Sequence, residues 1–268
     1  MLANERDSRR ASSGYVGQGL RAYFAWDAPT RRFHWINAIL FIAIVALGVA
    51  MLVGRWFGVG DEGRDRLKDI HLALGAALTV NLLWRCYWAF DGHRPAQWRS
   101  MLPGGPGYWR SLRAYVTALV AGQPKYYIGH NPLARLGVTV LLVLLVTQIL
   151  SGIALLGVDT FAPPPGQPLG DWSSPSAGRE IVPQLPWWFA WSATDAEAVR
   201  APLRAIHLYG FYLLVIAVVE HVVAVVVTEF REGGNLVSAM LTGWKAFPYR
   251  PEDDDAPDYS PRGEHRGR

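Results

Sequence analysis

Hydrophobic runs recur along this chain at lengths suited to a lipid bilayer. Four of them, with 22, 21, 23 and 24 residues, occupy positions 33–54, 70–90, 136–158 and 205–228. The only formally charged residues inside them are Arg85 in the second run and Glu220 in the fourth. A helix needs about 20 mostly apolar residues to cross the hydrocarbon core of a membrane. The pattern therefore predicts an all-α membrane protein with a bundle of four transmembrane helices.

Polar segments separate and flank these runs. Residues 1–22 and 249–268 have the composition of disordered tails, so residues 23–248 are expected to form the membrane domain. Pro29 stands just before the first run, where a helix start tolerates proline. Residues 107–122 have the pattern of an amphipathic helix lying on the membrane surface. Residues 187–191, WWFAW, are typical of an interfacial anchor.

The basic residues indicate an orientation in the membrane. Six lysines and arginines precede the first run and six lie between the second and third, whereas the other two connections carry four and three. Positively charged loops stay in the cytoplasm, so both termini are expected on the cytoplasmic side of the bacterial inner membrane. The first run begins too late and is too long for a cleavable signal peptide. The pI of 9.3 is explained by basic residues that flank the runs, which suits anionic lipid and not nucleic acid.

Several kinds of chemistry are excluded by the residues present. The chain has one cysteine, Cys86, so it forms no internal disulfide and has no motif for covalent attachment of a c-type haem. It shows no nucleophile with a base, no glycine-rich phosphate loop and no metalloprotease signature. No substrate-converting site is therefore indicated within the chain itself.

Histidines inside the hydrophobic runs form the main candidate site. His207 and His221 lie 14 residues apart in the fourth run. On a helix that interval leaves them about 40° apart in azimuth and about 21 Å apart in height, so they share one face. Ionisable side chains are costly inside a bilayer, so two imidazoles on one face at two depths suggest a function.

Depth predicts which histidines from other runs would join them. His71 and His207 each lie three residues past a basic residue that flanks their run, so they match in depth near the periplasmic side. His34 and His221 remain as a pair in the cytoplasmic half. Their distances from flanking charges differ, at two and eight residues, and helix tilt can absorb that difference.

Facing imidazoles in a bundle core are suited to ligate the iron of a b-type haem from both sides. Two such pairs would hold two haems and form an electron path through the membrane. The same pattern is open to other interpretations: a small transporter with polar gating residues, structural histidines in a plain membrane anchor, or another metal. Zinc fits less well, because structural zinc takes four ligands at one level.

Four further polar residues are candidates for roles near the cytoplasmic pair. Arg85 would neutralise a haem propionate or serve as a snorkelling anchor. Glu220 would relay protons to a quinone or form an ion pair with Arg85. His130 and Asn131 would hydrogen-bond a quinone carbonyl, although Asn-Pro is also a helix-start signal.

Several motifs occur together in an order that resembles one family. They are RRFHW (31–35), RCYWAFDG (85–92), YIGHNPLA (127–134), the pair His207 and His221, and NLVSAMLTGWK (235–245). Across residues 23–247 the chain resembles the bacterial cytochrome b-561 family. That family includes the b-type cytochrome subunit of nickel-iron hydrogenases and is similar to the membrane subunit of some formate dehydrogenases.

The resemblance implies a four-helix membrane bundle holding two non-covalent b haems, with His34, His71, His207 and His221 as axial ligands. It also implies electron transfer between membrane quinone and a periplasmic redox partner, a nickel-iron hydrogenase or a c-type cytochrome. Two positions depart from the hydrogenase members. Leu208 stands where they commonly have histidine or arginine, and His93 stands where they have asparagine.

Overall fold

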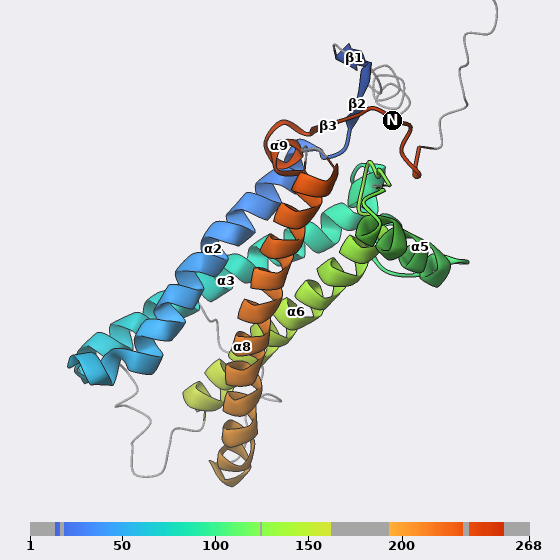
Figure 1. The fold of residues 1–268 in the computed structure, drawn as a ribbon. Coiled ribbons are helices and arrows are strands. Elements are labelled where there is room, and N and C mark those ends of the chain that lie inside the picture. Colours follow the sequence, from blue (N-terminus) through green and yellow to red (C-terminus); the bar gives the residue numbers. More distant parts are fainter. Residues whose placement is uncertain (1–13, 17–18, 124, 162–192, 233–235, 255–268) are drawn as a thin grey trace, which may run out of the picture.

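The computed structural model describes residues 14–16, 19–123, 125–161, 193–232 and 236–254. Within these residues the chain is mostly helical, and its long helices lie alongside one another (Figure 1). The long helices are α2 (Ala28–Val53), α3 (Asp61–Asp91), α6 (Pro132–Phe161) and α8 (Ala193–Glu232). The shorter helices are η1 (Gly54–Phe57), η2 (Arg94–Ala96), α4 (Trp98–Met101), α5 (Tyr108–Val120) and α9 (Leu236–Thr242). The strands are β1 (Gly14–Val16), β2 (Leu20–Phe24) and β3 (Trp244–Phe247).

Three of the long helices have the length and composition of membrane spans: Ala28–Val53 in α2, Pro132–Val158 in α6 and Ala198–Glu232 in α8. Helix α3 is also long enough, but it is less apolar. Its first turns are charged, and its second half includes Asn81 and Arg85. Between residues 76 and 90, however, its exposed side chains are hydrophobic, among them Val80 and Leu83.

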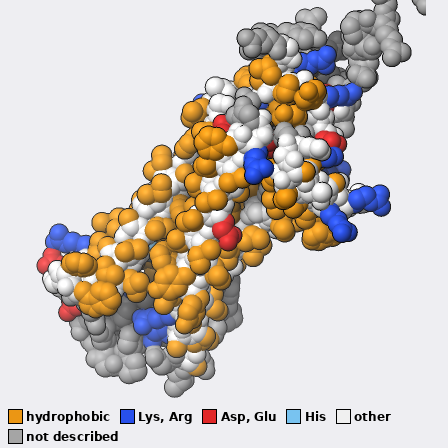
Figure 2. All heavy atoms as spheres, viewed as in Figure 1, with side chains coloured by type: hydrophobic (Ala, Val, Ile, Leu, Met, Phe, Trp, Pro, Cys, Tyr) orange, Lys and Arg blue, Asp and Glu red, His pale blue; other side chains and the backbone are white. Residues whose placement is uncertain are grey.

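The bundle is built from two helix pairs. The most extensive contacts join α2 with α3 and α6 with α8. A buried cluster of leucines connects the pairs, with Leu78 and Leu82 from α3, Leu145 from α6 and Leu214 from α8. Outward-facing side chains on these helices are largely apolar, and Figure 2 shows hydrophobic groups covering them along most of their length. In lipid such a bundle is held by close packing and interhelical hydrogen bonds, because lipid tails are as apolar as leucine.

Helix α2 begins where the sequence predicts a helix start, with Pro29 in its first turn. Asp27 caps it, since its Oδ1 accepts a hydrogen bond of 2.9 Å from the Thr30 backbone N–H. Its Oδ2 accepts from Trp88 Nε1 at 2.8 Å and from the His93 backbone N–H at 3.3 Å. One carboxylate thus fixes the end of α3 against the start of α2.

A small antiparallel sheet lies at the same end of the bundle, which we call the sheet end (Figure 1). Strand β2 pairs with β1 and with β3, so the two terminal parts of the chain meet there. The sheet is joined to the bundle through Gly243, whose carbonyl accepts hydrogen bonds from the N–H groups of Ala25 and Trp26. Gly243 has φ +92°, a conformation that glycine adopts without steric cost.

The prediction that both tails are disordered is wrong for part of each tail. Within residues 1–22, positions 14–16 and 20–22 belong to strands. In the C-terminal tail, Asp253 accepts hydrogen bonds from the N–H groups of Ile128 and Gly129 at 2.7 and 2.9 Å. These contacts join segments more than 100 residues apart, so local composition does not reveal them. Residues 1–13 and 255–268, like the segment 187–191, lie outside the described residues.

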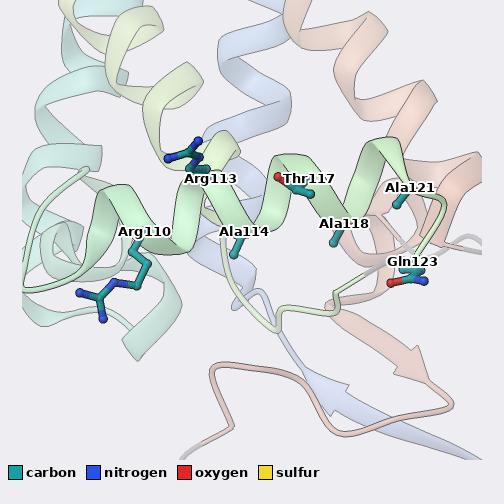
Figure 3. Close-up of a pocket in the computed structure, with 7 residues that line it drawn as sticks. All are labelled: Arg110, Arg113, Ala114, Thr117, Ala118, Ala121 and Gln123. Carbon is teal, nitrogen blue, oxygen red and sulfur yellow. The ribbon is translucent and has the colours of Figure 1, made fainter.

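The amphipathic segment before α6 forms the predicted helix, α5. Its buried side contains Tyr108, whose hydroxyl donates to the Pro132 carbonyl at 2.8 Å, and Tyr115. Its other side exposes Trp109 and Val120. A shallow hollow of about 470 Å³ runs along α5, and Figure 3 labels the side chains that line it: Arg110, Arg113, Ala114, Thr117, Ala118, Ala121 and Gln123. None of the histidines borders this hollow.

Candidate functional site

His71 of α3 and His207 of α8 lie together between the two helix pairs. Their ring centroids are 6.3 Å apart and their planes are inclined at 75°. An imidazole nitrogen binds a metal ion at about 2 Å and lies roughly 1 Å from its ring centroid, so two rings sharing one ion have centroids about 6 Å apart. The observed spacing therefore fits two histidines that share one iron.

Helix α6 contributes two contacts to His207, one with its ring and one with its backbone. Ser151 Oγ lies 2.9 Å from His207 Nδ1, and Gln148 Nε2 donates to the His207 carbonyl at 2.8 Å. A Cβ atom on Gly152 would lie 3.3 Å from His207 Cε1, and one on Gly210 would lie 2.5 Å from Gln148 Nε2. The small residues thus leave room for this arrangement.

His34 of α2 and His221 of α8 form the second pair, nearer the sheet end. The two imidazoles lie close enough to interact electrostatically. His34 Nδ1 is buried, and among the described residues it has no hydrogen-bond partner. Asn81 of α3 donates to the carbonyl of Phe33 at 3.2 Å and so fixes the backbone next to His34. The structure thus brings the rings of His71 and His207 together and places His34 within electrostatic range of His221, while the role of all four as ligands stays a prediction.

Arg85 is buried inside the bundle, with 4% of its surface exposed. Its Nη2 donates to the Ala96 carbonyl at 2.8 Å and contacts Met101 Sδ at 3.0 Å, and its guanidinium lies 5.8 Å from the centre of the Phe33 ring. Its Nη1 is buried and has no partner among the described residues. A side chain so enclosed is not snorkelling to the membrane surface. Its Nη1 group can instead donate a hydrogen bond to an anionic group.

Glu220 does not pair with Arg85. It is exposed on α8, one residue before His221, and the two charged groups share no ion pair. The physical reason is their direction, because α8 turns His221 inward and leaves its neighbour on the outer surface. The alternative that Glu220 forms an ion pair with Arg85 is therefore wrong, and the proton-relay hypothesis remains.

His130 lies just before α6, with its ring centroid 4.8 Å from that of Trp26. Its Nδ1 is buried and lacks a hydrogen-bond partner in the described part of the chain. Desolvation and the nearby charges of Lys245 and Arg85 lower the pKa of His130 to about 3, so it is neutral at physiological pH. The charge of a protonated His221 would act in the same direction, so the two histidines lie within electrostatic range of each other.

Asn131 begins α6. Its Oδ1 accepts a hydrogen bond from the Ala134 N–H at 2.7 Å, and its Nδ2 donates to the Tyr115 hydroxyl at 2.7 Å. The helix-start interpretation of the Asn-Pro pair is confirmed. The side chain is already engaged, which leaves His130 as the stronger quinone candidate of the two.

Three buried or inward-facing residues were missed from the sequence: Gln148, Ser151 and Lys245. The first two are polar residues three positions apart in an apolar run, a signal of one polar stripe on a helix. Lys245 is 3% exposed and its Nζ donates to the carbonyls of Tyr127 and Gly129 at 3.1 Å each. Burial lowers the pKa of Lys245 to about 8.

A conventional metal cluster does not appear in the described ranges, where no three His, Cys, Asp or Glu side chains come together as a possible metal site. Two histidines at one level are better suited to a cofactor whose metal needs two further ligands than to a bare metal ion.

A second hollow, of about 400 Å³, lies between α2 and α9 and is lined by Arg31, Arg32, Trp35 and their neighbours.

Comparison with known proteins identifies the family of this chain. Residues 25–243 match the family model described as prokaryotic cytochrome b561. The chain is similar to the probable Ni/Fe-hydrogenase B-type cytochrome subunit of Azotobacter vinelandii, with 29% identity over 88% of this chain and 92% of the relative. It is also similar to the corresponding subunit of Cupriavidus necator (25% identity, 86% and 90% covered). The match with the probable Ni/Fe-hydrogenase 1 B-type cytochrome subunit of Escherichia coli K12 has 24% identity and covers 85% and 92%.

Because the family match spans the bundle and its histidines, the chain is a multi-pass membrane protein that belongs to the prokaryotic cytochrome b561 family.

Proposed function

We propose that this protein is a di-haem b-type cytochrome that carries electrons across the cytoplasmic membrane between a periplasmic redox partner and membrane quinone. The observation that carries the proposal is the 6.3 Å separation of the His71 and His207 rings, which suits one iron between them. His34 and His221 would form the second ligand pair, at another level of the bundle. The 14-residue interval along α8 sets the two levels about 21 Å apart in height.

In this proposal α3 spans the membrane together with α2, α6 and α8, which makes four transmembrane helices. Its charged first turns would lie outside the hydrocarbon core, and its remaining length carries both His71 and Arg85. Hydrophobic side chains on its exposed surface, such as Val80 (67% exposed) and Leu83 (64%), are suited to contact with lipid. The distribution of lysine and arginine favours both termini on the cytoplasmic side, which makes His34–His221 the inner pair and His71–His207 the outer pair.

Each pair would supply two neutral imidazole nitrogens to a haem, and the haem, when bound, supplies a one-electron redox centre. The chain's own residues hold the ligands in place: Ser151 and Gln148 at His207, and Asn81 next to His34. Arg85 is suited to a haem propionate, because its buried Nη1 lacks a partner among the described residues and a carboxylate would satisfy it.

Quinone reduction needs proton donors near the inner pair. His130 is a neutral imidazole with a free buried Nδ1, which suits a hydrogen bond to a quinone carbonyl. Glu220 is exposed beside His221, so a quinone dissolved in the bilayer would reach it, and its carboxyl group would pass protons to the reduced ring. Asn131 would position His130 through the start of α6.

The names of the relatives point to a nickel-iron hydrogenase as the periplasmic partner, and a c-type cytochrome would fit the same outer position. The described part of the chain holds no large soluble domain, so substrate chemistry would belong to that partner. Electrons would then enter or leave at the outer pair, according to the relative potentials of partner and quinone.

The test is electron transfer by the purified protein in lipid vesicles. A membrane-impermeant reductant on the outer side should reduce the b haems, and a quinone should reoxidise them. Both steps would be followed by the visible absorbance of the haems. His207→Ala should stop this transfer, whereas His93→Ala, a histidine outside the long helices, should leave it intact. Glu220→Gln should keep both haems and slow the quinone step. Protein that carries no haem despite adequate haem supply would overturn the proposal.

A further inference from the structure

Ser151 sits where helix α6 meets the outer histidine pair. It is 4% exposed, so water does not compete for its hydroxyl. Three groups lie within hydrogen-bond distance of its Oγ: the Thr147 carbonyl at 2.7 Å, the Gln148 carbonyl at 3.2 Å and His207 Nδ1 at 2.9 Å. A serine hydroxyl has one hydrogen to donate and two lone pairs that accept.

The proposed haem sets the direction of the contact with His207, which otherwise depends on the tautomer of the ring. Neutral imidazole carries one proton, so a ring that binds a metal through Nε2 carries that proton on Nδ1. His207 Nδ1 would then donate to a lone pair of Ser151 Oγ, and the hydroxyl hydrogen would go to a backbone carbonyl, of which that of Thr147 is nearer.

The support is stronger at His207 than at the other histidines for which contacts are known. His71, across the outer site, and His34, in the inner pair, both have buried Nδ1 atoms without a partner among the described residues. His207 is in addition held through its backbone by Gln148 Nε2 at 2.8 Å. Helix α6 thus contacts His207 at both its ring and its backbone carbonyl.

We propose that Ser151 is a positioning residue for His207 and lowers the reduction potential of the outer haem. An imidazole that donates from Nδ1 to an acceptor becomes a stronger electron donor at Nε2, which stabilises ferric over ferrous iron. The two haems of one chain would then differ in potential partly because of this hydroxyl. The inference rests on the proposed function, because it needs a haem at His207.

The experiment is a redox titration of the full-length protein carrying Ser151→Ala, followed by its visible absorbance and by electron paramagnetic resonance of the ferric haems. Two haems should remain bound, one midpoint potential should move upward, and the low-spin signal of that one haem should change. The other midpoint should stay where it is in the wild-type protein. Ser151→Thr keeps a hydroxyl on the same carbon and should restore the original potential.

Thr147→Ala is the matched control. Thr147 lies one helical turn away on α6, and its hydroxyl donates to the Val143 carbonyl at 2.9 Å, so it resembles Ser151 without a neighbouring histidine ring. This variant should leave both midpoints unchanged. If Ser151→Ala retains both haems with unchanged potentials and signals, or shifts both haems equally, the role of Ser151 is refuted while the di-haem proposal stands. Wild-type protein without haem would instead refute the di-haem proposal itself.

Discussion

Lys245 shows how a single buried charge is accommodated at the sheet end. Its ammonium group donates to two backbone carbonyls, those of Tyr127 and Gly129, and lies 5.7 Å from the centre of the Trp26 ring. The two carbonyls accept from two of its three hydrogens, and these contacts do not replace full hydration. Burial therefore outweighs the attraction of Glu232 and Asp253, and the pKa of Lys245 falls from 10.5 to about 8.

This shift predicts a pH dependence of stability. Between pH 8 and 10.5 the unfolded chain holds a proton on Lys245 that the folded chain has released, so the free energy of unfolding rises with pH across that window. Lys245→Met should remove this contribution. The measurement is thermal unfolding in detergent from pH 7 to 10, where the wild-type protein should gain stability relative to the variant. Parallel pH profiles for the two proteins would contradict the assignment.

For single residues, the sequence predicted which histidines lie at matching depths, but it did not predict which buried polar residues contact other elements of the fold. The depths of His71 and His207 followed from counting residues along two helices. Ser151 and Lys245 could not be assigned in the same way, because their importance comes from contacts with other helices and strands. A serine in an apolar helix usually bonds its own backbone, as Ser151 also does, so its second partner is visible only in three dimensions.

Helix α3 is the element on which the architecture depends most. It carries His71 and Arg85, and it packs against α2 and contacts α6, yet its composition alone does not mark it as a membrane span. Polar residues that face the bundle interior, such as Asn81, lower its hydropathy without exposing polar groups to lipid. The length of the run from residue 70 to residue 90 predicted a membrane span here. The average hydropathy of α3 is lower than that of the other three long helices and does not predict one.

Leu83 provides a direct test of the position of α3, because 64% of its surface is exposed. If that surface faces lipid, Leu83→Arg should cost about 2.5–3.5 kcal/mol and reduce membrane insertion and folded yield. A surface substitution in water usually changes stability by less than about 0.5 kcal/mol. Leu83→Ile, which stays apolar, should behave like the wild-type protein. Equal yield and thermal stability for Leu83→Arg would place α3 outside the bilayer.

Across the whole molecule, two helix pairs are joined by interior leucines, and the rings of His71 and His207 meet between the pairs at another level. The four long helices were predictable from their apolar runs. The sheet was not, because β2 and β3 pair over more than 200 residues of sequence. This sheet links residues 21–24 with residues 244–247 at the end of the bundle nearer His34. Arg31 reinforces the link through a hydrogen bond to the Leu241 carbonyl, and Trp35 Nε1 donates to the Met240 carbonyl at 2.9 Å.

The central claim is that four histidines act as two pairs, and haem content per chain tests it most directly. Wild-type protein and His93→Ala should bind close to two b haems, and each single alanine substitution at His34, His71, His207 or His221 should leave one. The double variant His71→Ala/His207→Ala should still retain one haem, because both ligands belong to the same site. His71→Ala/His221→Ala should retain none. Equal haem content in the two double variants, or no haem in the wild-type protein, would contradict the pairing.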